Sequence, residues 1–498
     1  MGVMDGILEG AKVAFSFQGI LFVLMGVFLG TIIGMLPGLG PITAIGVMIP
    51  ISYGMDPNMA LVMMAGIYYG AIFGGSTSSI LLNAPGVAGT VATAFDGYPM
   101  AQQGKAGKAL AIAAVSSFVG GTVGVIFLML FAPLLASVAI SFGPPEYFAL
   151  MLLALTAIAS LSEGSTIKAL ISGTLGFMVA MIGIDGQTGT SRFTFGSASL
   201  LSGIDFLVIA LGIFALAEVF KLIITRNESD SGPNKNIGSI RITKSEMKEM
   251  SGPMSRQSVL GFLIGVLPGA GATIASFIAY ITEKKIAKNP EEFGKGSIKG
   301  LTAPETANNA ATSGAFVPLL SLGIPGSGTT AVLLGALMVM GIQPGPMLFT
   351  EKPDLFWGVI ISMYIGNIFL LILNLPLIPY ISKLLNIPRP MLISLVTIFC
   401  LIGVYGISFN TFDLYLLLAF GIIGYLLRLV SFPAAPFILA FILGEMIEQS
   451  VRKSLTISNG SFMIFLERPI TLAFLIITVL SLALPPLLGM RKKIKSIE

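Results

Sequence analysis

The sequence predicts an all-α polytopic membrane protein with about 10 to 14 transmembrane helices, broken or re-entrant helical hairpins and two internally repeated halves. Three observations lead to this fold class. Apolar residues make up 55% of the 498 residues and charged residues only 10%, whereas a soluble domain carries about 25% charged residues. Apolar runs long enough to cross a bilayer recur along the chain. The 59 glycines and 28 prolines interrupt some of these runs.

Each apolar run is expected to form a helix, because lipid offers no hydrogen-bond partner to an unpaired backbone. After a first apolar segment near the N-terminus, the runs lie at about 60–82, 108–132, 146–161, 168–184, 204–222, 355–380, 391–409, 412–430, 432–448 and 469–489. Glycine and proline inside such runs permit close helix packing, and they break helices where the backbone lines a cavity.

Several classes of protein are excluded by residues that are missing or scarce. The chain has no histidine, which removes imidazole metal sites and Ser-His hydrolysis. Its single cysteine, Cys400, allows no intrachain disulfide. Gly104-Lys105 is followed by Ala106, so a phosphate-binding loop is missing and ATP hydrolysis is not expected. The net charge of +4 gives no indication of nucleic-acid binding. We therefore expect a protein that is not an enzyme and that draws its energy from a gradient.

One long polar stretch divides the chain. Residues 221–257 carry a basic excess that predicts a cytoplasmic linker, formed by Lys221, Arg226, Lys235, Arg241, Lys244, Lys248 and Arg256. The predicted domains are a first transmembrane half at 1–220, this linker at 221–257 and a second transmembrane half at 258–498. The basic C-terminus is expected to be cytoplasmic as well.

The two halves share two motifs in the same order, which predicts an internal repeat. In the first motif, Gly30, Gly34, Pro37, Gly38 and Gly40 match Gly261, Gly265, Pro268, Gly269 and Gly271 at one constant offset. In the second motif, Pro85, Gly86 and Thr90 match Pro325, Gly326 and Thr330 at an offset nine residues longer. The extra length fits the charged stretch at 283–299. Interrupted apolar segments in corresponding positions of two halves indicate a transporter binding site.

The apolar segment 258–282 has basic residues on both sides. If both flanks are cytoplasmic, the chain must enter the membrane and return, turning at Pro268-Gly269. Each limb would then be about 18 Å of helix. A single kinked span is the alternative.

Two polar stretches are the candidate substrate site. Broken helices present free N–H groups and positive dipole ends to an anion, glycine allows close approach, and hydroxyls and amides add hydrogen bonds. The candidate substrate-binding residues are Gly74, Ser76, Thr77, Ser78, Asn83, Pro85 and Gly86 in the first half, and Pro325, Gly326, Ser327, Thr329 and Thr330 in the second. The alternative is that the hydroxyls bond back to their own helices.

A cation site is predicted at the segment that begins at Ala303. Glu305 would bind the ion, with Asn308 and Asn309 supplying carbonyl oxygens, because hard cations take oxygen ligands. The glycines of the first motif (Gly38, Gly40, Gly269 and Gly271) are added as candidates at the hairpin tips. A helix N-terminus with a dipole-compensating acid, and scaffold bends, are the alternatives. Glu445 is expected to pair with Arg428 or Arg452.

Several long strings resemble one family. They are G-M-L-P-G-L-G-P from Gly34, Y-Y-G-A-I-F-G-G-S-T-S-S-I-L-L-N-A-P-G from Tyr68, D-G-Y-P-M-A-Q-Q-G-K-A from Asp96, A-P-E-T-A-N-N-A from Ala303, L-G-I-P-G-S from Leu322 and S-M-Y-I-G-N from Ser362. The chain resembles the large membrane subunit of the tripartite tricarboxylate transporters over nearly its whole length.

The resemblance implies a multi-pass protein of the bacterial inner membrane that works with a small membrane subunit and a periplasmic solute-binding protein. It implies uptake of tricarboxylates or dicarboxylates such as citrate by cation symport, with Na⁺ as the coupling ion, no other cofactor and an elevator-like movement. An anion-conducting channel and a membrane-embedded enzyme are the alternatives. Two unlike polar interruptions in one chain fit alternating access better than the repeated filter of a channel.

Overall fold

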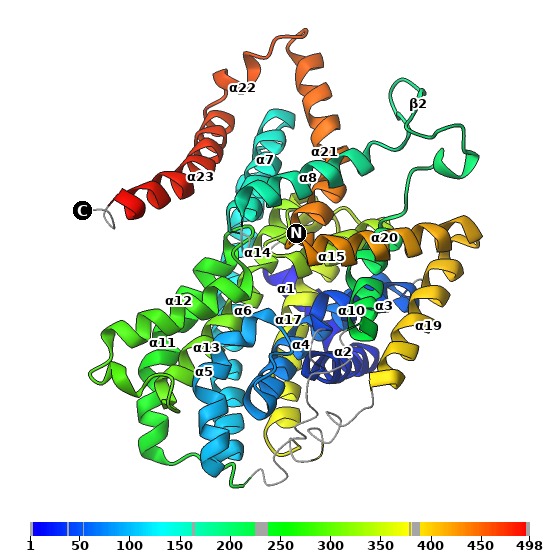
Figure 1. The fold of residues 1–498 in the computed structure, drawn as a ribbon. Helices are drawn as coiled ribbons and strands as arrows, with labels where there is room; N and C mark the ends of the chain where they lie inside the picture. Colours follow the sequence, from blue (N-terminus) through cyan, green and yellow to red (C-terminus); the bar gives the residue numbers. More distant parts are fainter. Residues whose placement is uncertain are drawn as a thin grey trace.

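The computed structural model describes residues 3–36, 39–52, 54–161, 165–224, 238–377, 380 and 389–494. Helices dominate this part of the chain, and a short antiparallel ribbon pairs two residues of β1 (Gly183–Ile184) with two of β2 (Ser191–Arg192). The fold class predicted from composition is confirmed. Figure 1 shows the helices stacked in several directions rather than as one parallel bundle.

The bounds of the elements follow the predicted apolar runs. Up to the central linker they are α1 Val3–Ala14, α2 Phe17–Met35, α3 Gly40–Ser52, α4 Pro57–Leu82, η1 Ala88–Thr90, α5 Val91–Met100, η2 Ala101–Lys105, α6 Ala106–Ala139, α7 Pro144–Leu161, α8 Thr166–Ala180, η3 Ala198–Leu200, α9 Phe206–Ala210, η4 Leu211–Leu216 and α10 Ala217–Ile224. After it they are α11 Lys244–Val266, α12 Gly271–Ile286, η5 Pro290–Glu292, α13 Ile298–Gly314, α14 Phe316–Leu322, α15 Gly328–Val339, α16 Pro346–Glu351, α17 Pro353–Asn374, α19 Arg389–Ser408, α20 Thr411–Leu429, α21 Ala434–Ile457, α22 Ile464–Glu467 and α23 Pro469–Ile494.

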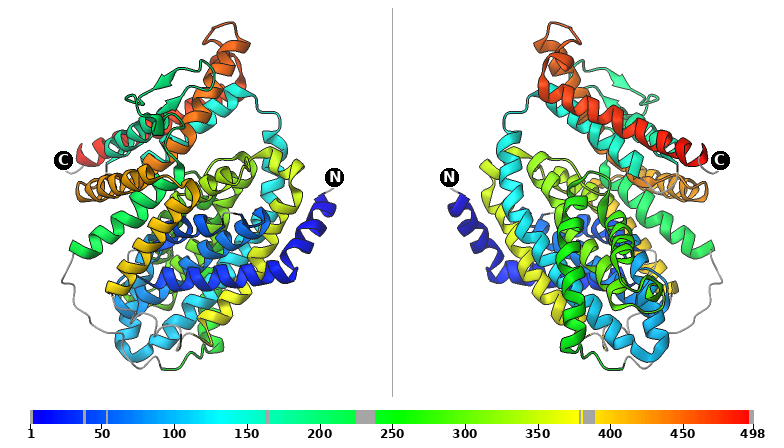
Figure 2. Two further views of the ribbon diagram at one scale, coloured as in Figure 1. Left: turned by 90° about the vertical axis from the view of Figure 1, so that its right-hand side faces the viewer. Right: turned by 90° about the vertical axis from the view of Figure 1, so that its left-hand side faces the viewer.

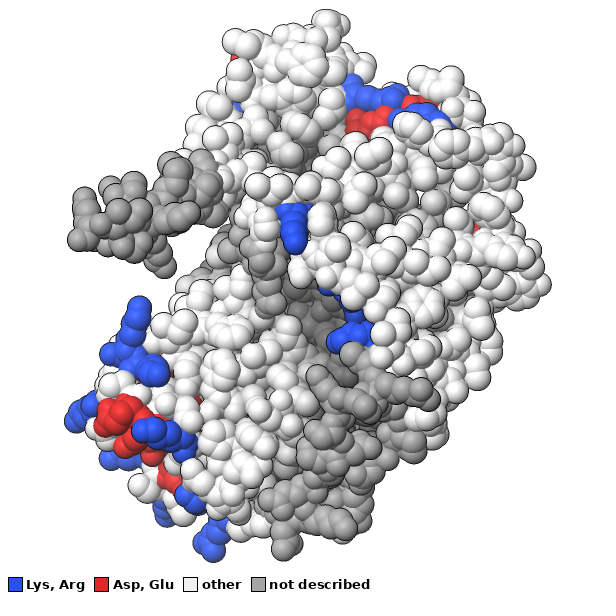
Figure 3. All heavy atoms as spheres, in the orientation of Figure 1, with Lys and Arg blue, Asp and Glu red and all other residues white. Residues whose placement is uncertain are grey.

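Every predicted apolar run contains a helix of the structure. Within the described residues, seven helices are long and apolar enough to span a bilayer, and several shorter apolar helices accompany them. Figure 3 shows charged side chains gathered at the lower left, over α11 and α12, and at the upper right, with largely uncharged surface between. Many large apolar side chains of the described residues are exposed. This distribution is expected of a protein surrounded by lipid.

Two close helix crossings, α2 with α4 and α11 with α13, follow the sequence repeat. At each crossing, glycines of the first helix lie against backbone carbonyl oxygens of the second, where a Cβ atom would overlap the oxygen. The pairs are Gly30 with Ile67 and Gly34 with Ala71 in the first half, and Gly261 with Ala307 and Gly265 with Ala311 in the second. The glycines of the two halves are related by the constant offset of the first motif. The residues whose carbonyls they contact are related by the longer offset of the second motif. The extra nine residues therefore fall between α12 and α13, where the charged stretch lies.

The α11–α12 segment turns back on itself, as the charge pattern predicts. The chain reverses at 267–270, and both helices pack on α13. Arg256 of α11 and Glu283 of α12 form an ion pair with an Nη2–Oε2 distance of 2.8 Å, and Gln257 donates to the same carboxylate. Each limb beyond this pair is about a dozen residues long, so the two limbs run antiparallel to a shared tip.

A second group of helices lies at the other end of the molecule. α21 packs on α8 and α7, and α23 packs on α7. Figure 2 shows these helices beyond the level of α2 and α4, with the β1–β2 ribbon beside them. Of the predicted central linker, residues 225–237 lie outside the described residues, whereas 221–224 belong to the end of α10 and 238–257 include the first part of α11.

Candidate functional site

The interrupted segments of both halves meet inside the molecule. The backbone N–H of Gly269, at the tip of the α11–α12 hairpin, donates to the carbonyl oxygen of Gly326 at 2.9 Å. Tyr68 of α4 lies 3.2 Å from Ser327 through their hydroxyl oxygens. A Cβ at Gly89 would lie 3.3 Å from the Ala272 Cβ at the start of α12. These contacts join the first Pro-Gly segment, the second Pro-Gly segment and one hairpin tip.

The first half of the chain reaches the same region through α3, which begins at the Gly40 turn. Gly328, the first residue of α15, faces Ile42 of α3, with 3.3 Å between an added Cβ and the Ile42 Cδ1. α3 begins at Gly40 and α12 at Gly271, and both glycines have φ +57, a conformation that glycine adopts at little cost. The N-terminal ends of α3, α12, α15 and the η1–α5 segment therefore converge, and their dipoles share one positive region.

The breaks themselves have matching geometry. Asn83 caps the C-terminal end of α4 and Gly323 that of α14. These two positions are related by the second repeat offset, and both residues are left-handed, with φ 55 and φ 70. The chain then passes through Pro85-Gly86 or Pro325-Gly326 before the next helix begins. The left-handed residue ends each helix, and the proline after it favours an extended approach to the next one.

The first candidate stretch divides into residues with different partners. Ser76 donates to the Glu305 carboxylate, and Thr77 lines a small cavity beside it. Ser78 donates to the carbonyl of Gly75 in its own helix, as the alternative interpretation predicted. Asn83 is exposed at the break.

Two glycines of that stretch serve backbone packing. An added Cβ at Gly74 would overlap the Thr31 carbonyl, and one at Gly86 would overlap the Gly34 carbonyl. They bring the first break directly against α2. Pro85, which directly precedes Gly86, is half-buried.

In the second stretch, the polar groups cap α15. Ser327 accepts from the Thr330 backbone N–H at 3.3 Å, and Thr330 accepts from the Ser327 N–H at 2.8 Å. Pro325 and Gly326 are buried, and Thr329 is 6% exposed. This capping box fixes the start of α15, and the other N–H groups of its first turn have no acceptor within the helix.

Glu305 is the centre of a polar cluster drawn from four helices. Its carboxylate is completely buried on α13. Ser76 of α4 lies 2.8 Å from both carboxylate oxygens, Ser117 of α6 donates to Oε2 at 2.7 Å, and Thr93 of α5 donates to Oε1. Within the described part of the chain, no lysine or arginine forms an ion pair with this carboxylate. A buried carboxylate held by neutral polar side chains is a candidate site for a coupling cation.

The two asparagines predicted beside Glu305 make other contacts. Asn308 donates to the Gly89 carbonyl at 3.3 Å, and Asn309 donates to the Asn308 side-chain oxygen at 2.7 Å. Asn308 thus ties α13 to the first break, whereas the Oδ1 of Asn309 is buried without a partner. Gly40, Gly269 and Gly271 lie at the tips already described, and Gly38 lies outside the described residues.

Sequence reasoning missed Thr93, Ser117 and Asn374. Thr93 and Ser117 contact Glu305, and Asn374 lines the small cavity together with Ser76 and Ser117. Asn374 is a lone polar residue inside an apolar run, which is a detectable signal, whereas Ser117 follows Ser116 and Thr93 lies outside the predicted runs. Their common target becomes visible only when α4, α5, α6, α13 and α17 are assembled.

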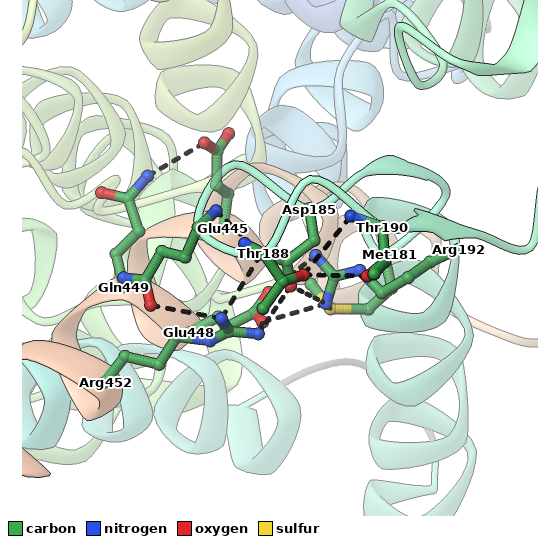
Figure 4. Close-up of polar contacts among 10 residues, drawn as sticks. Met181, Asp185, Thr188, Thr190, Arg192, Glu445, Glu448, Gln449 and Arg452 are labelled. Atoms are coloured by element: carbon green, nitrogen blue, oxygen red, sulfur yellow. Dashed lines mark hydrogen bonds and ion pairs between the residues drawn. The ribbon is translucent and has the colours of Figure 1, made fainter.

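A much wider pocket, here called the wide pocket, lies at the far end of α15. It is bounded by the loop at 181–206, by the C-terminal end of α15 and by α21. Figure 4 shows Asp185 and Arg192 of the loop meeting Glu448 and Arg452 of α21. Arg452 lies 2.7 Å from Asp185, and Arg192 lies 2.9 Å from Glu448. Backbone N–H groups of Thr188 and Gln187 donate to Asp185 and hold its pKa well below the usual range. Arg452 lowers this pKa further, to a smaller extent.

The predicted pairing of Glu445 is wrong. Glu445 accepts a hydrogen bond from Gln449 one turn along α21 (Figure 4). Arg428 pairs with Glu218, and Arg452 pairs with Asp185 and Glu448. The reason is geometric, because the 181–206 loop folds over α21 and supplies partners that are remote in sequence.

Comparisons with known proteins agree with the resemblance seen in the motifs. The model of the tripartite tricarboxylate transporter TctA family matches residues 20–439. An uncharacterized 52.8 kDa protein in the TAR-I ttuC' 3' region of Agrobacterium vitis is 43% identical over 493 residues, which are 99% of this chain and 98% of the relative. An uncharacterized protein in the TAR-II ttuC' 3' region of the same species is 46% identical over 233 residues, covering 47% of this chain and 96% of the relative. No solved structure matches.

Proposed function

Because the chain belongs to the tripartite tricarboxylate transporter TctA family, we propose that it is the solute-translocating subunit of a secondary transporter. Family membership and the apolar helices establish a multi-pass membrane component of a tripartite transporter. The proposal adds that the subunit takes up small tricarboxylates or dicarboxylates, such as citrate, by symport with a cation.

The convergence of helix beginnings from both halves is the observation that carries this proposal. The segments 83–90 and 323–330 contain no charged residue, yet they bring several N-terminal helix ends together. Such ends offer partial positive charge and N–H donors, which favour a carboxylate without requiring a buried lysine or arginine. A solute held this loosely can also be released, as transport requires.

Glu305 supports coupling to a cation. Its buried charge is costly unless a counter-ion or proton accompanies it, and it lies on α13 one turn before Asn308, which bonds to the first break at Gly89. Filling or emptying a site at Glu305 would therefore act on the segment proposed to contact the substrate. Sodium is the expected ion, because oxygen atoms surround the carboxylate.

The partners and the orientation are also part of the proposal. A bacterial inner-membrane location with the basic linker on the cytoplasmic side follows the positive-inside rule. The wide pocket then opens at the opposite, periplasmic end, where a solute-binding protein would deliver substrate. A small membrane subunit would complete the assembly.

Radiolabelled citrate uptake tests the function directly. The chain would be reconstituted in proteoliposomes with the small membrane subunit and the binding protein, and an inward Na⁺ gradient would be applied. We expect accumulation above equilibrium that stops when the gradient is collapsed. Flux that equilibrates citrate without accumulating it, and that ignores every cation gradient, would indicate a channel and contradict the proposal.

A further inference from the structure

A small cavity lies directly beside the Glu305 cluster. Its wall contains Ser76 and Thr77 of α4, Ser117 of α6 and Asn374 at the end of α17, with apolar residues completing the lining. The space is roughly that of one water molecule. Ser76 and Ser117 are the same residues that donate hydrogen bonds to the Glu305 carboxylate.

The hydrogen-bond directions make this cavity rich in acceptors. A hydroxyl has one hydrogen and two lone pairs. Ser76 and Ser117 use their hydrogens on Glu305, so their lone pairs are left for the cavity. The side-chain amide of Asn374 donates to the Leu370 carbonyl at 3.0 Å, and the Oδ1 of Asn374 is buried without a partner.

An unpartnered oxygen on a side chain that is 3% exposed points to a missing ligand. Leaving a buried acceptor unpaired costs about 1–3 kcal/mol. A cation that accepts lone pairs from Asn374 and the two serines would remove this cost. It would also compensate the single negative charge of Glu305, which no described lysine or arginine pairs.

We propose that this cavity is the binding site of one alkali-metal cation, Na⁺, with oxygen ligands from Ser76, Ser117 and Asn374. The Glu305 carboxylate, which accepts hydrogen bonds from both serines, supplies the counter-charge. The inference rests on the proposed symport function and assigns the ion to particular residues. It replaces Asn308 and Asn309 as predicted ligands with Ser76, Ser117 and Asn374. A monovalent ion is chosen because the cluster holds one carboxylate, whereas divalent sites usually recruit more.

The position of the site gives a physical link to the substrate region. Its ligands come from α4, α6 and α17 and its counter-charge, Glu305, from α13, and Thr93 on α5 donates to the same carboxylate. α4 and α5 flank the first break, so an ion here stabilises one arrangement of the helices on both sides of it. Coupling then follows from differential stabilisation of two arrangements.

The test uses Asn374→Leu, which keeps the side-chain size and removes the oxygen. The matched control is Asn367→Leu on the same helix, because the Oδ1 of Asn367 is also buried and unpartnered but Asn367 does not line the cavity. Two readouts are measured for the complete transporter. The first is the rise in unfolding temperature when NaCl replaces choline chloride or KCl at equal ionic strength, and the second is the Na⁺ concentration that half-saturates citrate uptake.

We expect Na⁺ to stabilise the wild type more than K⁺ or choline does. Asn374→Leu should need roughly tenfold or more Na⁺ for both effects, and Ser117→Ala should shift them in the same direction. Asn367→Leu should keep the wild-type Na⁺ dependence.

Equal Na⁺ responses in wild type, Asn374→Leu and Ser117→Ala would overturn the site, since the cavity would then hold only water. A wild type that ignores Na⁺ and follows the pH gradient would also overturn it, with Glu305 carrying a proton. Absence of any carboxylate uptake, together with a Na⁺ stabilisation that Asn374→Leu loses, would leave the ion site standing and remove the transport proposal.

Discussion

Glu305 brings a carboxylate into the packed interior without a basic partner among the described residues. Three hydroxyls hold the carboxylate in place, but hydroxyls alone do not neutralise it. The residue therefore combines a fixed geometry with an uncompensated charge, and this combination is what a coupling-ion site requires.

Replacing Glu305 with glutamine tests the charge apart from the shape. We expect Glu305→Gln to insert and fold, since it keeps the side-chain size, while Na⁺-driven citrate accumulation falls by roughly tenfold or more because the ion loses its counter-charge. Glu292→Gln is the matched control, because Glu292 is exposed on η5, accepts a hydrogen bond from Asn289 and lines neither pocket. Accumulation by Glu305→Gln at the wild-type level and Na⁺ dependence would contradict the role.

The depressed pKa of Asp185 predicts how the loop over the wide pocket responds to pH. A carboxyl whose pKa is lowered in the folded state stabilises it above the unfolded pKa of about 3.9, and this contribution is lost as pH falls through the folded pKa. A spin label at Ser191→Cys should therefore show unchanged loop mobility from about pH 5 to 8. Asp185→Asn should raise that mobility at pH 7. A loop that loosens near pH 6 would contradict this prediction.

At the scale of elements, glycine crossings set how closely the paired helices approach. Gly34→Ala and Gly265→Ala place a Cβ atom on the carbonyl oxygens of Ala71 and Ala311. Because backbone atoms cannot move aside cheaply, each variant should lose roughly 1–3 kcal/mol of stability, measured as a lower unfolding temperature in detergent. Gly46→Ala is the control, since its Cβ would meet only a Leu211 methyl at 3.5 Å. Equal stability of all three variants would mean that the crossings are not tightly packed.

These elements are also where prediction from the sequence succeeded. Composition gave the fold class, matched glycines located the paired crossings, and basic flanks located the α11–α12 reversal. The motif offsets even placed the nine-residue insertion between α12 and α13, since the contact pairs obey them. Such features are local or periodic, so they leave a trace along the chain.

The contacts of the candidate site were harder to predict. Ser76, Thr93 and Ser117 converge on Glu305 from helices that are remote in sequence, and nothing local specifies a shared partner. Ser78, in contrast, was a candidate site residue, but its hydroxyl donates to a carbonyl within its own helix. Residue type alone does not separate these two cases. Whether the candidate residues bind a carboxylate remains a prediction.

At the scale of the whole molecule, the charge distribution predicts one orientation in the membrane. Lys248 on α11 and Lys285 on α12 are exposed at one end, whereas Gln187 is exposed at the wide pocket. Cysteines at the two lysines should react with a membrane-impermeant thiol reagent from the cytoplasmic side only. A cysteine at Gln187 should react from the periplasmic side.

Labelling of the native protein by the thiol reagent should be weak, because its cysteine, Cys400, is buried. Reaction of Lys248→Cys and Lys285→Cys from opposite sides would show that 258–282 crosses the membrane once. The hairpin would then be a packing feature within a different topology, and the proposed central site would lose one of its tips.

A density map of the complete transporter with citrate and Na⁺ tests the central claim most directly. We expect citrate density where α15 and the η1–α5 segment begin, with its carboxylates toward backbone N–H groups, and a separate ion peak beside Glu305 and Asn374. Citrate found elsewhere, with side chains filling the space between the Pro85-Gly86 and Pro325-Gly326 segments, would contradict it.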